Sequence, residues 1–480
     1  MNLDKYKHIV FSLVTGGLLL VGLFLLLSGA PQIIRADPGD LFVSTTGSGS
    51  ACTQAAPCTL QTALSRAADG DTIYLAQGTY TGTGDAVATV TKSITLCGGW
   101  DGTTTTPPVC DPHAHPATID GEGARRGVYI GGDITPTLRG LRITRGNAAG
   151  LGGYEYYGTH DAGGGVYVIT ATVTLADNDI FGNTAQHGAG VSLINSQGTL
   201  HHNTIFSNTA TGGGGGVFAY EGAPTLSGNA ILSNTSSNIG GGLYLFSTTP
   251  SLLYNTVAGN NARRSGGGIC IASCNPTLTG NLVIGNEATK GGGIELWYSD
   301  SPLTNNVIAD NRATARGSGL WIGRSEPSLR HTTLARNTGG DGGGVFVTND
   351  GSSTPRTVVM TNTILVGHAV GISVTAGSKV TLEATLWGSG AWANGTDWGG
   401  DGIIVAGTIN VRGDPAFVNP DGGDYHIGPG SAAIDAGVNA GVTTDIDGDF
   451  RPKEGGYDIG ADEFGQQWNI YLPLVVKHYP

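Results

Sequence analysis

Four charged residues in the second half of the chain are the strongest candidates for acid–base chemistry: Glu295, Arg324, Glu326 and Asp341. Hydrolysis of a glycosidic bond needs paired carboxyl groups, and elimination needs a Lys or Arg base beside acidic metal ligands. Glu295 is the best single candidate because it interrupts a column of aromatic residues. No Asp–Asp pair or histidine partner accompanies it at a matching position, so a solvated charge beside an aromatic surface is the alternative interpretation.

Three aspartates near the C-terminus could bind Ca²⁺: Asp445, Asp447 and Asp449. They alternate with other residues in a glycine-containing turn, and carboxylate oxygens at loop spacing are typical calcium ligands. The segment lacks the remaining ligands and the closing Glu of an EF-hand loop. The sequence therefore offers Ca²⁺ as its only candidate cofactor, and a structural acidic turn without metal as the alternative.

Aromatic residues recur on one predicted strand of successive repeats. Neighbouring residues of a strand point to opposite faces, so strands that direct aliphatic residues inward place these rings on the outer surface. The eight predicted outward rings are Tyr167, Phe218, Tyr220, Tyr244, Phe246, Trp297, Trp321 and Phe346. Such a surface predicts a stacking platform for an extended glycan. The alternatives are cross-strand packing and burial under the N-terminal loops or under the segment Trp387–Trp398.

The elements that position these residues follow from a repeat of 25–26 residues. An aliphatic residue follows a glycine-rich turn at Val166, Val191, Val217, Leu243, Ile269, Ile294, Leu320 and Val345. Two asparagine columns keep the same register, and their members are Asn178, Asn203, Asn229, Asn255, Asn281 and Asn306, then Asn183, Asn208, Asn234, Asn260, Asn286, Asn311 and Asn337. Three short strands and their turns fill about 25 residues, which is one coil of a parallel β-helix. We expect the asparagines to form hydrogen-bonded rows at the turns.

The composition agrees with this all-β class and excludes some partners. Gly accounts for 82 of the 480 residues, and only 13% of residues are charged. Abundant glycine with few Lys, Glu and Met disfavours helices and favours short strands joined by tight turns. The formal net charge of -13 argues against sequence-independent binding of nucleic acid or anionic lipid, which needs a basic surface.

The six cysteines form three local pairs, each closing a short loop. The pairs are Cys52 with Cys58, Cys97 with Cys110, and Cys270 with Cys274. A cysteine metal site would require clustered ligands such as two CxxC elements, and the sequence contains no CxxC element. We therefore predict three disulfides and an oxidising compartment.

The N-terminus predicts export. Lys5 and Lys7 precede an apolar run, Ile9–Leu27, and small residues end at Ala36. This order is typical of a cleaved signal peptide at 1–36, and an uncleaved membrane anchor is the alternative. A short helix at Leu60–Ala67 is expected to cap the first coils, because the end of a solenoid exposes apolar residues.

The predicted organisation has five parts. After the signal peptide, residues 37–137 form the N-terminal cap and first coils, and residues 138–425 form the β-helix repeats. A distinct C-terminal segment occupies 426–466, and a tail occupies 467–480.

Several motifs resemble known families. GDTIYLAQGTY (Gly70–Tyr80), KSITLCG (Lys92–Gly98) and the glycine- and asparagine-marked repeats look like the secreted right-handed parallel β-helix, or pectin-lyase-like, superfamily. The repeats also resemble those of polymorphic outer-membrane proteins. PGSAAIDAG (Pro429–Gly437) and YDIGADEF (Tyr457–Phe464) resemble the choice-of-anchor segment of bacterial surface proteins, and the last residues are similar to tails of Chloroflexi-type exported proteins.

These resemblances imply a right-handed β-helix that is secreted or displayed on the cell surface. In segments that resemble this one, the acidic turn with Arg451 and Asp458 forms a structural polar network. We predict a monomeric protein that binds polysaccharide or a cell-envelope glycan, with no membrane contact beyond the export signal or an anchor. The alternatives are a polysaccharide lyase or glycoside hydrolase on the same fold, and a passive surface structural protein or adhesin.

Overall fold

The computed structural model describes residues 39–453 and 455–465. The predicted signal peptide and the C-terminal tail lie outside these residues. In the described ranges, no helix has the length and apolar character needed to cross a membrane.

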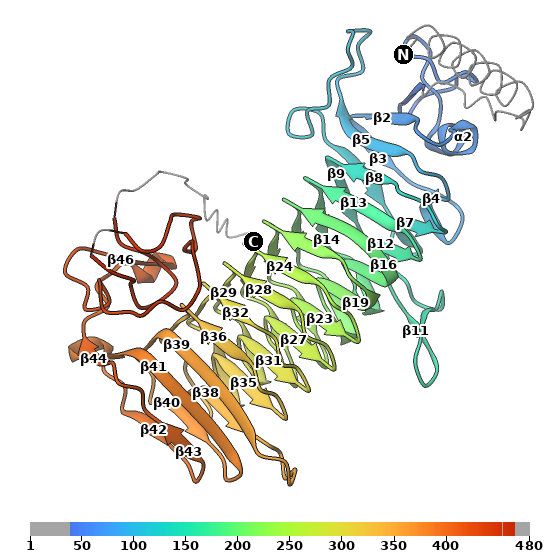
Figure 1. Cartoon of the computed structure of the whole chain (residues 1–480). Helices are drawn as coiled ribbons and strands as arrows, with labels where there is room; N and C mark the ends of the chain where they lie inside the picture. Colours follow the sequence, from blue (N-terminus) through green and yellow to red (C-terminus); the bar gives the residue numbers. More distant parts are fainter. Residues whose placement is uncertain (1–38, 454, 466–480) are drawn as a thin grey trace, which may run out of the picture. The chain divides into compact units, whose positions relative to one another are not determined.

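The described chain is a stack of parallel β coils (Figure 1). In a central coil, β19 (Val217–Gly222) is followed by β20 (Thr225–Ser227), β21 (Ala230–Leu232) and β22 (Thr235–Ser236). Each strand pairs in parallel with the equivalent strand of the next coil, for example β19 with β23 (Leu243–Phe246). The all-β parallel solenoid expected from the sequence is confirmed. A bend splits one face between β20 and β21, so this coil has four short strands where three were expected.

The core lies inside the coils and consists of stacked aliphatic side chains. Val217, Leu243 and Ile269 occupy equivalent positions in three consecutive coils, and all three are fully buried. The same holds for the remaining residues of the predicted aliphatic column, which are Val166, Val191, Ile294, Leu320 and Val345. The 25–26-residue register therefore places one side chain of this column in the core of each coil.

Each bend of a coil contains a residue with positive φ. In the coil of β19 these residues are Glu221 (56°), Gly228 (61°), Ser233 (52°) and Gly240 (61°). Left-handed backbone turns the chain sharply, and it is most easily adopted by glycine. Many of the abundant glycines therefore lie at corners. Other residues adopt the same left-handed geometry at many equivalent positions.

Two rows of asparagines lie immediately after two of these corners and point into the coil. The Asn208 amide nitrogen Nδ2 donates to Asn234 Oδ1 of the next coil (3.0 Å) and to Ile180 O of the preceding coil (2.9 Å). The backbone N–H of Asn208 donates to the same Asn234 Oδ1 (3.0 Å). The second row, at Asn203 and Asn229, repeats this pattern. The expected asparagine rows are confirmed, and the left-handed residue is the one that precedes each asparagine.

The N-terminal end is covered as the sequence predicts. The helix α2 (Leu60–Arg66) begins at Thr59, whose side chain accepts the N–H of Thr62, and it buries Leu60 and Ala63. These two residues belong to the same apolar cluster as Ile73 of β2 (Thr72–Ala76). The helix therefore covers the aliphatic core of the first coils.

Two of the three predicted disulfides are present: Cys52–Cys58 and Cys97–Cys110. The prediction of a third bond is wrong, because Cys270 and Cys274 are both free. Cys270 lies on the outer face of β27 (Ile269–Ala272) with its Sγ 3.2 Å from Glu295 Oε2. Cys274 comes after a left-handed corner at Ser273, and its Sγ donates to Leu245 O and packs in the core. The strand between them separates the two thiols.

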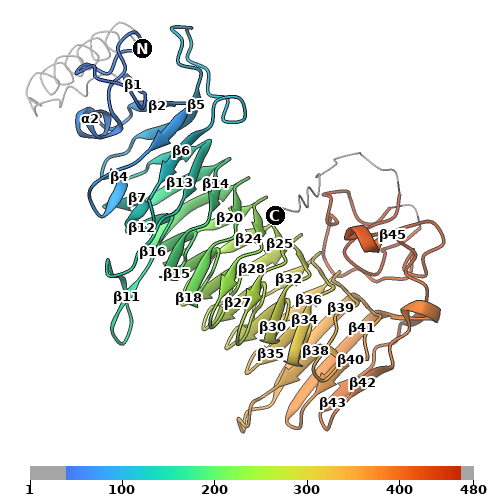
Figure 2. The same cartoon turned by 180° about the vertical axis from the view of Figure 1, so that it is seen from behind.

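The C-terminal segment packs on the outer face of the late coils (Figure 2). Ile427 of β46 (Asp424–Ile427) and Ile459 join an apolar cluster with Ile364 of β39 (Arg356–Val366). Asn362, at a left-handed corner, exchanges hydrogen bonds with the backbone N–H and C=O of Val438 (2.9 and 2.7 Å). The segment is therefore attached by both apolar contacts and outward-pointing corner residues.

Replacing one asparagine of the row tests its contribution to stability. Asn234→Ala leaves Ile205 O and the Asn208 N–H without their partners in a buried site. Unsatisfied buried groups cost ~1–3 kcal/mol each, so we expect the free energy of unfolding to fall by roughly 3 kcal/mol or more. Denaturant unfolding measures the change. Asn261→Ala, at the exposed position of the next coil that pairs with Thr235, serves as the control and is expected to change little.

A second prediction concerns acid. His368 continues one asparagine row, since Asn337 Nδ2 contacts its Nε2 (3.2 Å), and burial lowers its pKa to about 4. The unfolded histidine titrates near ~6.5, so the unfolded chain binds the proton first and stability is lost as the pH falls from about 6.5 towards 4. His368→Asn should reduce this loss by about 2–3 kcal/mol in urea unfolding at pH 7 and pH 4. An unchanged pH dependence would contradict the assignment, and exposed His202→Asn is the control.

Candidate functional site

The predicted outward rings lie on one sheet, on strands in parallel register. Phe218 of β19 pairs with Tyr244 of β23, and Tyr220 pairs with Phe246. The remaining four lie on β12 (Val166–Ile169), β31 (Ile294–Trp297), β35 (Leu320–Gly323) and β38 (Gly343–Thr348). The eight rings form two parallel columns. The first contains Tyr167, Phe218, Tyr244, Trp321 and Phe346, and the second contains Tyr220, Phe246 and Trp297.

The first column is largely covered by side chains from the adjacent corner. The Lys290 ammonium lies over the Trp321 ring at 5.4 Å, and the Arg316 guanidinium lies over the Phe346 ring at 5.0 Å. Both rings are buried, as are Tyr167 and Phe218, whereas Tyr244 is half-buried. The packing interpretation therefore applies to most of this column.

A hairpin covers part of the sheet as well. Its strands, β10 (Gly153–Glu155) and β11 (Thr159–Asp161), leave the stack of coils as a projecting hairpin (Figures 1 and 2). The buried Tyr154 ring meets Phe218 and Tyr220 edge-on, with ring centroids 5.0 and 4.8 Å apart. Tyr156 meets Phe246 in the same manner at 5.1 Å. The hairpin thus buries Phe218 and adds a ring of its own beside the second column.

The hairpin is fixed to the coils by polar contacts. Arg126 donates from Nη2 to Gly152 O (2.6 Å) and from Nε to Ala162 O (3.0 Å). The Tyr167 hydroxyl donates to Gly153 O (2.6 Å). These bonds use the polar groups of Arg126 and Tyr167, so both residues support the hairpin and neither faces a ligand. The segment Trp387–Trp398, the other predicted cover, instead continues the coils through β41 (Ser378–Gly388) and β42 (Thr396–Gly399).

The second column and its neighbours remain open. We define the open aromatic row as the half-buried Tyr220, Phe246 and Trp297 together with the exposed Tyr156, Tyr157 and Tyr298. The Tyr220 and Phe246 rings are stacked with centroids 5.6 Å apart. Ala272 separates Phe246 from Trp297, so the open row has a small residue between two rings. The open aromatic row is therefore interrupted at Ala272, where a small side chain lies between the rings of Phe246 and Trp297.

Trp297 lies beside a cation and a second indole. The Arg324 guanidinium lies 5.3 Å from the Trp297 ring and 5.4 Å from the Tyr298 ring, and it also donates to the Tyr298 hydroxyl and to Asp350 O (3.1 Å). Trp297 stacks on Trp321 at 5.6 Å. A Cβ at Gly323 would lie 2.2 Å from Trp321 and 2.8 Å from Trp297, so glycine is required there. Strand alternation does not predict the outward position of Tyr298, because this residue occupies a left-handed corner.

Glu295, the strongest predicted acid–base residue, is almost fully buried in the first column. It contacts the Cys270 thiol, and burial raises the pKa of the Glu295 carboxyl. Its position between Cys270 and Trp321 follows from the strand register.

The other three predicted catalytic residues have separate partners. Arg324 lies against the open aromatic row, whereas Glu326 pairs with Arg356 (3.7 Å) and accepts the Thr357 N–H (3.1 Å). Asp341 Oδ1 accepts the backbone N–H groups of Gly317, at a corner, and of Gly343, the first residue of β38. Among the described residues, no hydrogen bond or ion pair joins any two of the four candidates. Their catalytic role stays a prediction.

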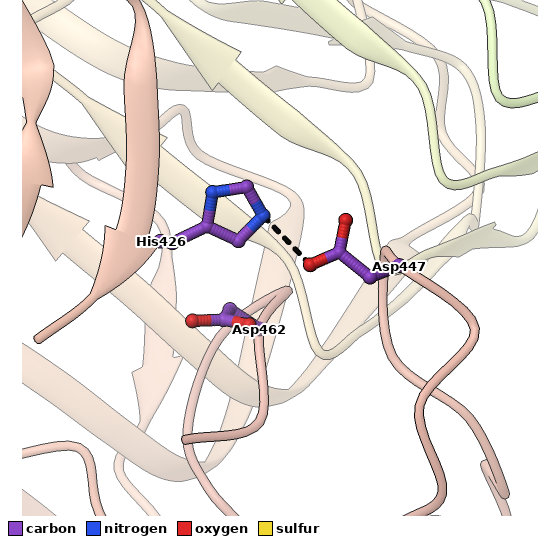
Figure 3. Close-up of side chains that lie close together, drawn as sticks. All are labelled: His426, Asp447 and Asp462. Carbon is purple, nitrogen blue, oxygen red and sulfur yellow. Dashed lines mark ion pairs between the residues drawn. The ribbon is translucent and has the colours of Figure 1, made fainter. Parts of the chain in front are cut away.

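The three aspartates predicted to bind Ca²⁺ point in different directions. Asp445 Oδ1 accepts the N–H groups of Asp447 and Asp449 and closes the turn. Asp449 pairs with Lys453 (2.5 Å), and Asp447 faces the His426 ring (Figure 3). Only Asp447 therefore joins a cluster of groups that could ligate a metal.

That cluster consists of His426, Asp447 and Asp462, and we call it the histidine–aspartate cluster. One ligand atom from each residue lies within 4.8 Å of the other two. The hydrogen bond to Asp424 and the nearby Asp447 carboxylate raise the pKa of His426 to about 11, and burial raises the pKa of Asp462 to about 7. The acidic turn predicts Asp447 as a ligand but not His426 or Asp462, because the three residues come from separate turns and strands.

The structural polar network that the resemblance implied is present nearby. Arg451 and Glu463 form a fully buried ion pair (2.5 Å), and Arg451 Nη2 donates to Gly460 O (3.0 Å). Glu463 also accepts the Asp458 N–H (3.1 Å). These contacts connect the turns of the C-terminal segment.

Comparison with known proteins agrees with the coil geometry. Residues 126–311 match the family model described as "Right handed beta helix region". The coils form a right-handed parallel β-helix. Among solved structures, the pectate lyase Pel9A is similar with a TM-score of 0.45 and 13% identity, over 89% of this chain and 96% of that chain. The alginate lyase AlyGC of family PL6 aligns with a TM-score of 0.18 and 10% identity, over 77% and 78% of the two chains. No curated protein matches the sequence.

The two aromatic columns should respond differently to truncation. Trp321→Ala removes a buried ring and is expected to lower the free energy of unfolding by about 3–5 kcal/mol. Trp297→Ala removes a half-buried ring at the surface, so we expect a loss of only about 1 kcal/mol. Denaturant unfolding of both variants measures the difference. Equal losses would show that the second column is as much a part of the packing as the first.

Proposed function

We propose that this protein is an exported, secreted or surface-displayed β-helix that binds an extended polysaccharide along the open aromatic row. The observation that supports this most directly is the half-buried pair of stacked rings, Tyr220 and Phe246, continued two coils later by Trp297. Aromatic faces suit the apolar faces of sugar rings. Exposed apolar surface of this extent commonly marks an interaction site.

The scaffold suits a repetitive ligand. Successive coils are spaced by about 4.8 Å, so equivalent side chains recur at regular intervals along the sheet. The rings of the second column stand on hydrogen-bonded strands, and Tyr156 is held by the anchored hairpin. Rings that are already in place lose little conformational freedom on binding.

Cations along one corner favour an acidic polymer. Lys290 and Arg316 occupy paired positions in consecutive coils, and Arg264 lies at the corner of the coil before them. All three are exposed, in a protein whose formal net charge is -13. Carboxylate groups of a ligand would gain charge-assisted hydrogen bonds there. We therefore expect acidic polysaccharides to bind more tightly than neutral ones.

Export is part of the same proposal. The two disulfides of the N-terminal region, Cys52–Cys58 and Cys97–Cys110, support an oxidising compartment. A surface or secreted location would bring the aromatic row into contact with extracellular glycans.

Affinity electrophoresis against polygalacturonate, alginate and a neutral glucan tests the proposal. We expect retention by at least one acidic polymer, weakened by salt. The double variant Phe246→Ala/Trp297→Ala should bind about tenfold or more weakly, because each ring contributes roughly 1 kcal/mol. Tyr254→Ala is the matched control, since this exposed ring follows β24 (Ser251–Leu253) outside the aromatic sheet.

Two outcomes would contradict the proposal. Absence of retention by every polymer would favour a passive structural protein. Release of unsaturated or reducing ends during incubation would instead favour a lyase or a glycoside hydrolase.

A further inference from the structure

The histidine–aspartate cluster joins three parts of the C-terminal segment. His426 lies on β46, Asp447 lies in the turn closed by Asp445, and Asp462 follows the buried Ile459. Figure 3 shows the Asp447 carboxylate beside a nitrogen of the imidazole and the Asp462 carboxylate below the ring. None of these three side chains belongs to the open aromatic row.

Asp424 fixes the orientation of the His426 imidazole. His426 Nδ1 lies 2.6 Å from Asp424 Oδ1, which also accepts the His426 backbone N–H (3.1 Å). An ionised carboxylate can only accept, so Nδ1 carries the donated proton and Nε2 faces the cluster. A histidine that binds a metal commonly donates its other ring N–H to a carboxylate in this way.

The other ring nitrogen of His426, Nε2, has no hydrogen bond. Nε2 is buried and lies 2.9 Å from Asp447 Oδ2, but the two atoms do not meet in hydrogen-bond geometry. A buried polar atom without a hydrogen bond often marks a water or ion site. The imidazole and the two carboxylates therefore lie close enough together to act as ligands of one cation.

Asp462 provides a buried third ligand. Its side chain is held by the Ile427 N–H, which donates to Oδ2 (2.8 Å), and the residue is only 8% exposed. Within the described residues, none of the ion pairs involves this carboxylate. Burial of an unpaired carboxylate is costly unless a cation or a proton neutralises it.

We propose that His426, Asp447 and Asp462 bind one divalent transition-metal ion, with Asp424 orienting the histidine. One imidazole and two carboxylates form a ligand set that Zn²⁺ and similar ions accept. Ca²⁺ prefers six to eight oxygen ligands, so the site differs from the calcium turn expected at Asp445, Asp447 and Asp449. The bound ion would connect three separate turns and stabilise the C-terminal segment.

The test uses the full chain stripped of metal with a chelator. Titration calorimetry with Zn²⁺, Ca²⁺ and Mg²⁺ should show one saturable Zn²⁺ site and much weaker binding of the other two ions. His426→Ala and Asp462→Asn should each weaken Zn²⁺ binding at least 100-fold. Asp424→Asn should weaken it about 10–100-fold, as loss of an orienting carboxylate does. His202→Ala, at an exposed histidine 3.8 Å from Asp177, should leave binding unchanged.

A second readout guards against misfolded variants. Zn²⁺ should raise the melting temperature of the wild-type chain above its value in chelator, and the same comparison for Asp424→Asn should show that most of this rise is lost. The proposal fails if the wild-type chain shows no saturable Zn²⁺ binding, if Ca²⁺ binds as tightly, or if His426→Ala and Asp462→Asn both bind Zn²⁺ like the wild type. It does not depend on glycan binding, so either proposal can fail without the other.

Discussion

Buried amide-to-amide hydrogen bonds between successive coils are the interaction on which the rest of this protein depends. Away from the ends of the rows, each carboxamide oxygen accepts two N–H groups of the preceding coil, and each carboxamide nitrogen donates both onward and backward. The rows lie beside left-handed corners, where the backbone leaves groups unpaired between strands. A coil that slipped by one residue would break these bonds and would also turn its aliphatic side chains outward. The hydrogen bonds and the aliphatic side chains inside the coils therefore fix the register that positions the surface residues.

Much of the fold could be predicted because the determining residues recur at one period. Val217, Leu243 and Ile269 define the interior, and the asparagine columns define two corners, so a single sequence contains many copies of the same signal. The outward direction of Phe246 and Trp297 followed from the same alternation. Residues at the corners, such as Tyr298, escaped the prediction because a left-handed residue interrupts the alternation.

The features that the sequence did not reveal depend on contacts without a repeat. Tyr154 buries Phe218 through a hairpin that is not repeated from coil to coil, so no column of residues in the sequence predicts this contact. Cys270 and Cys274 are close in sequence, but the strand directs one thiol outward and the corner returns the other to the core. The histidine–aspartate cluster assembles from residues that are more than ten positions apart, and the acidic turn alone suggested oxygen ligands without the imidazole.

The register of the coils also sets how this surface can change in length. A row of side chains that stands on successive coils can grow or shrink only by whole units of 25–26 residues, each adding about 4.8 Å. Extra residues are accommodated between the strands instead. The row passes from Asn337 to His368, a longer interval than in the central coils, and the added residues leave the hydrogen-bonded contact intact. The length of this surface along the sheet is therefore set by the number of coils. The loops can vary in length without changing it.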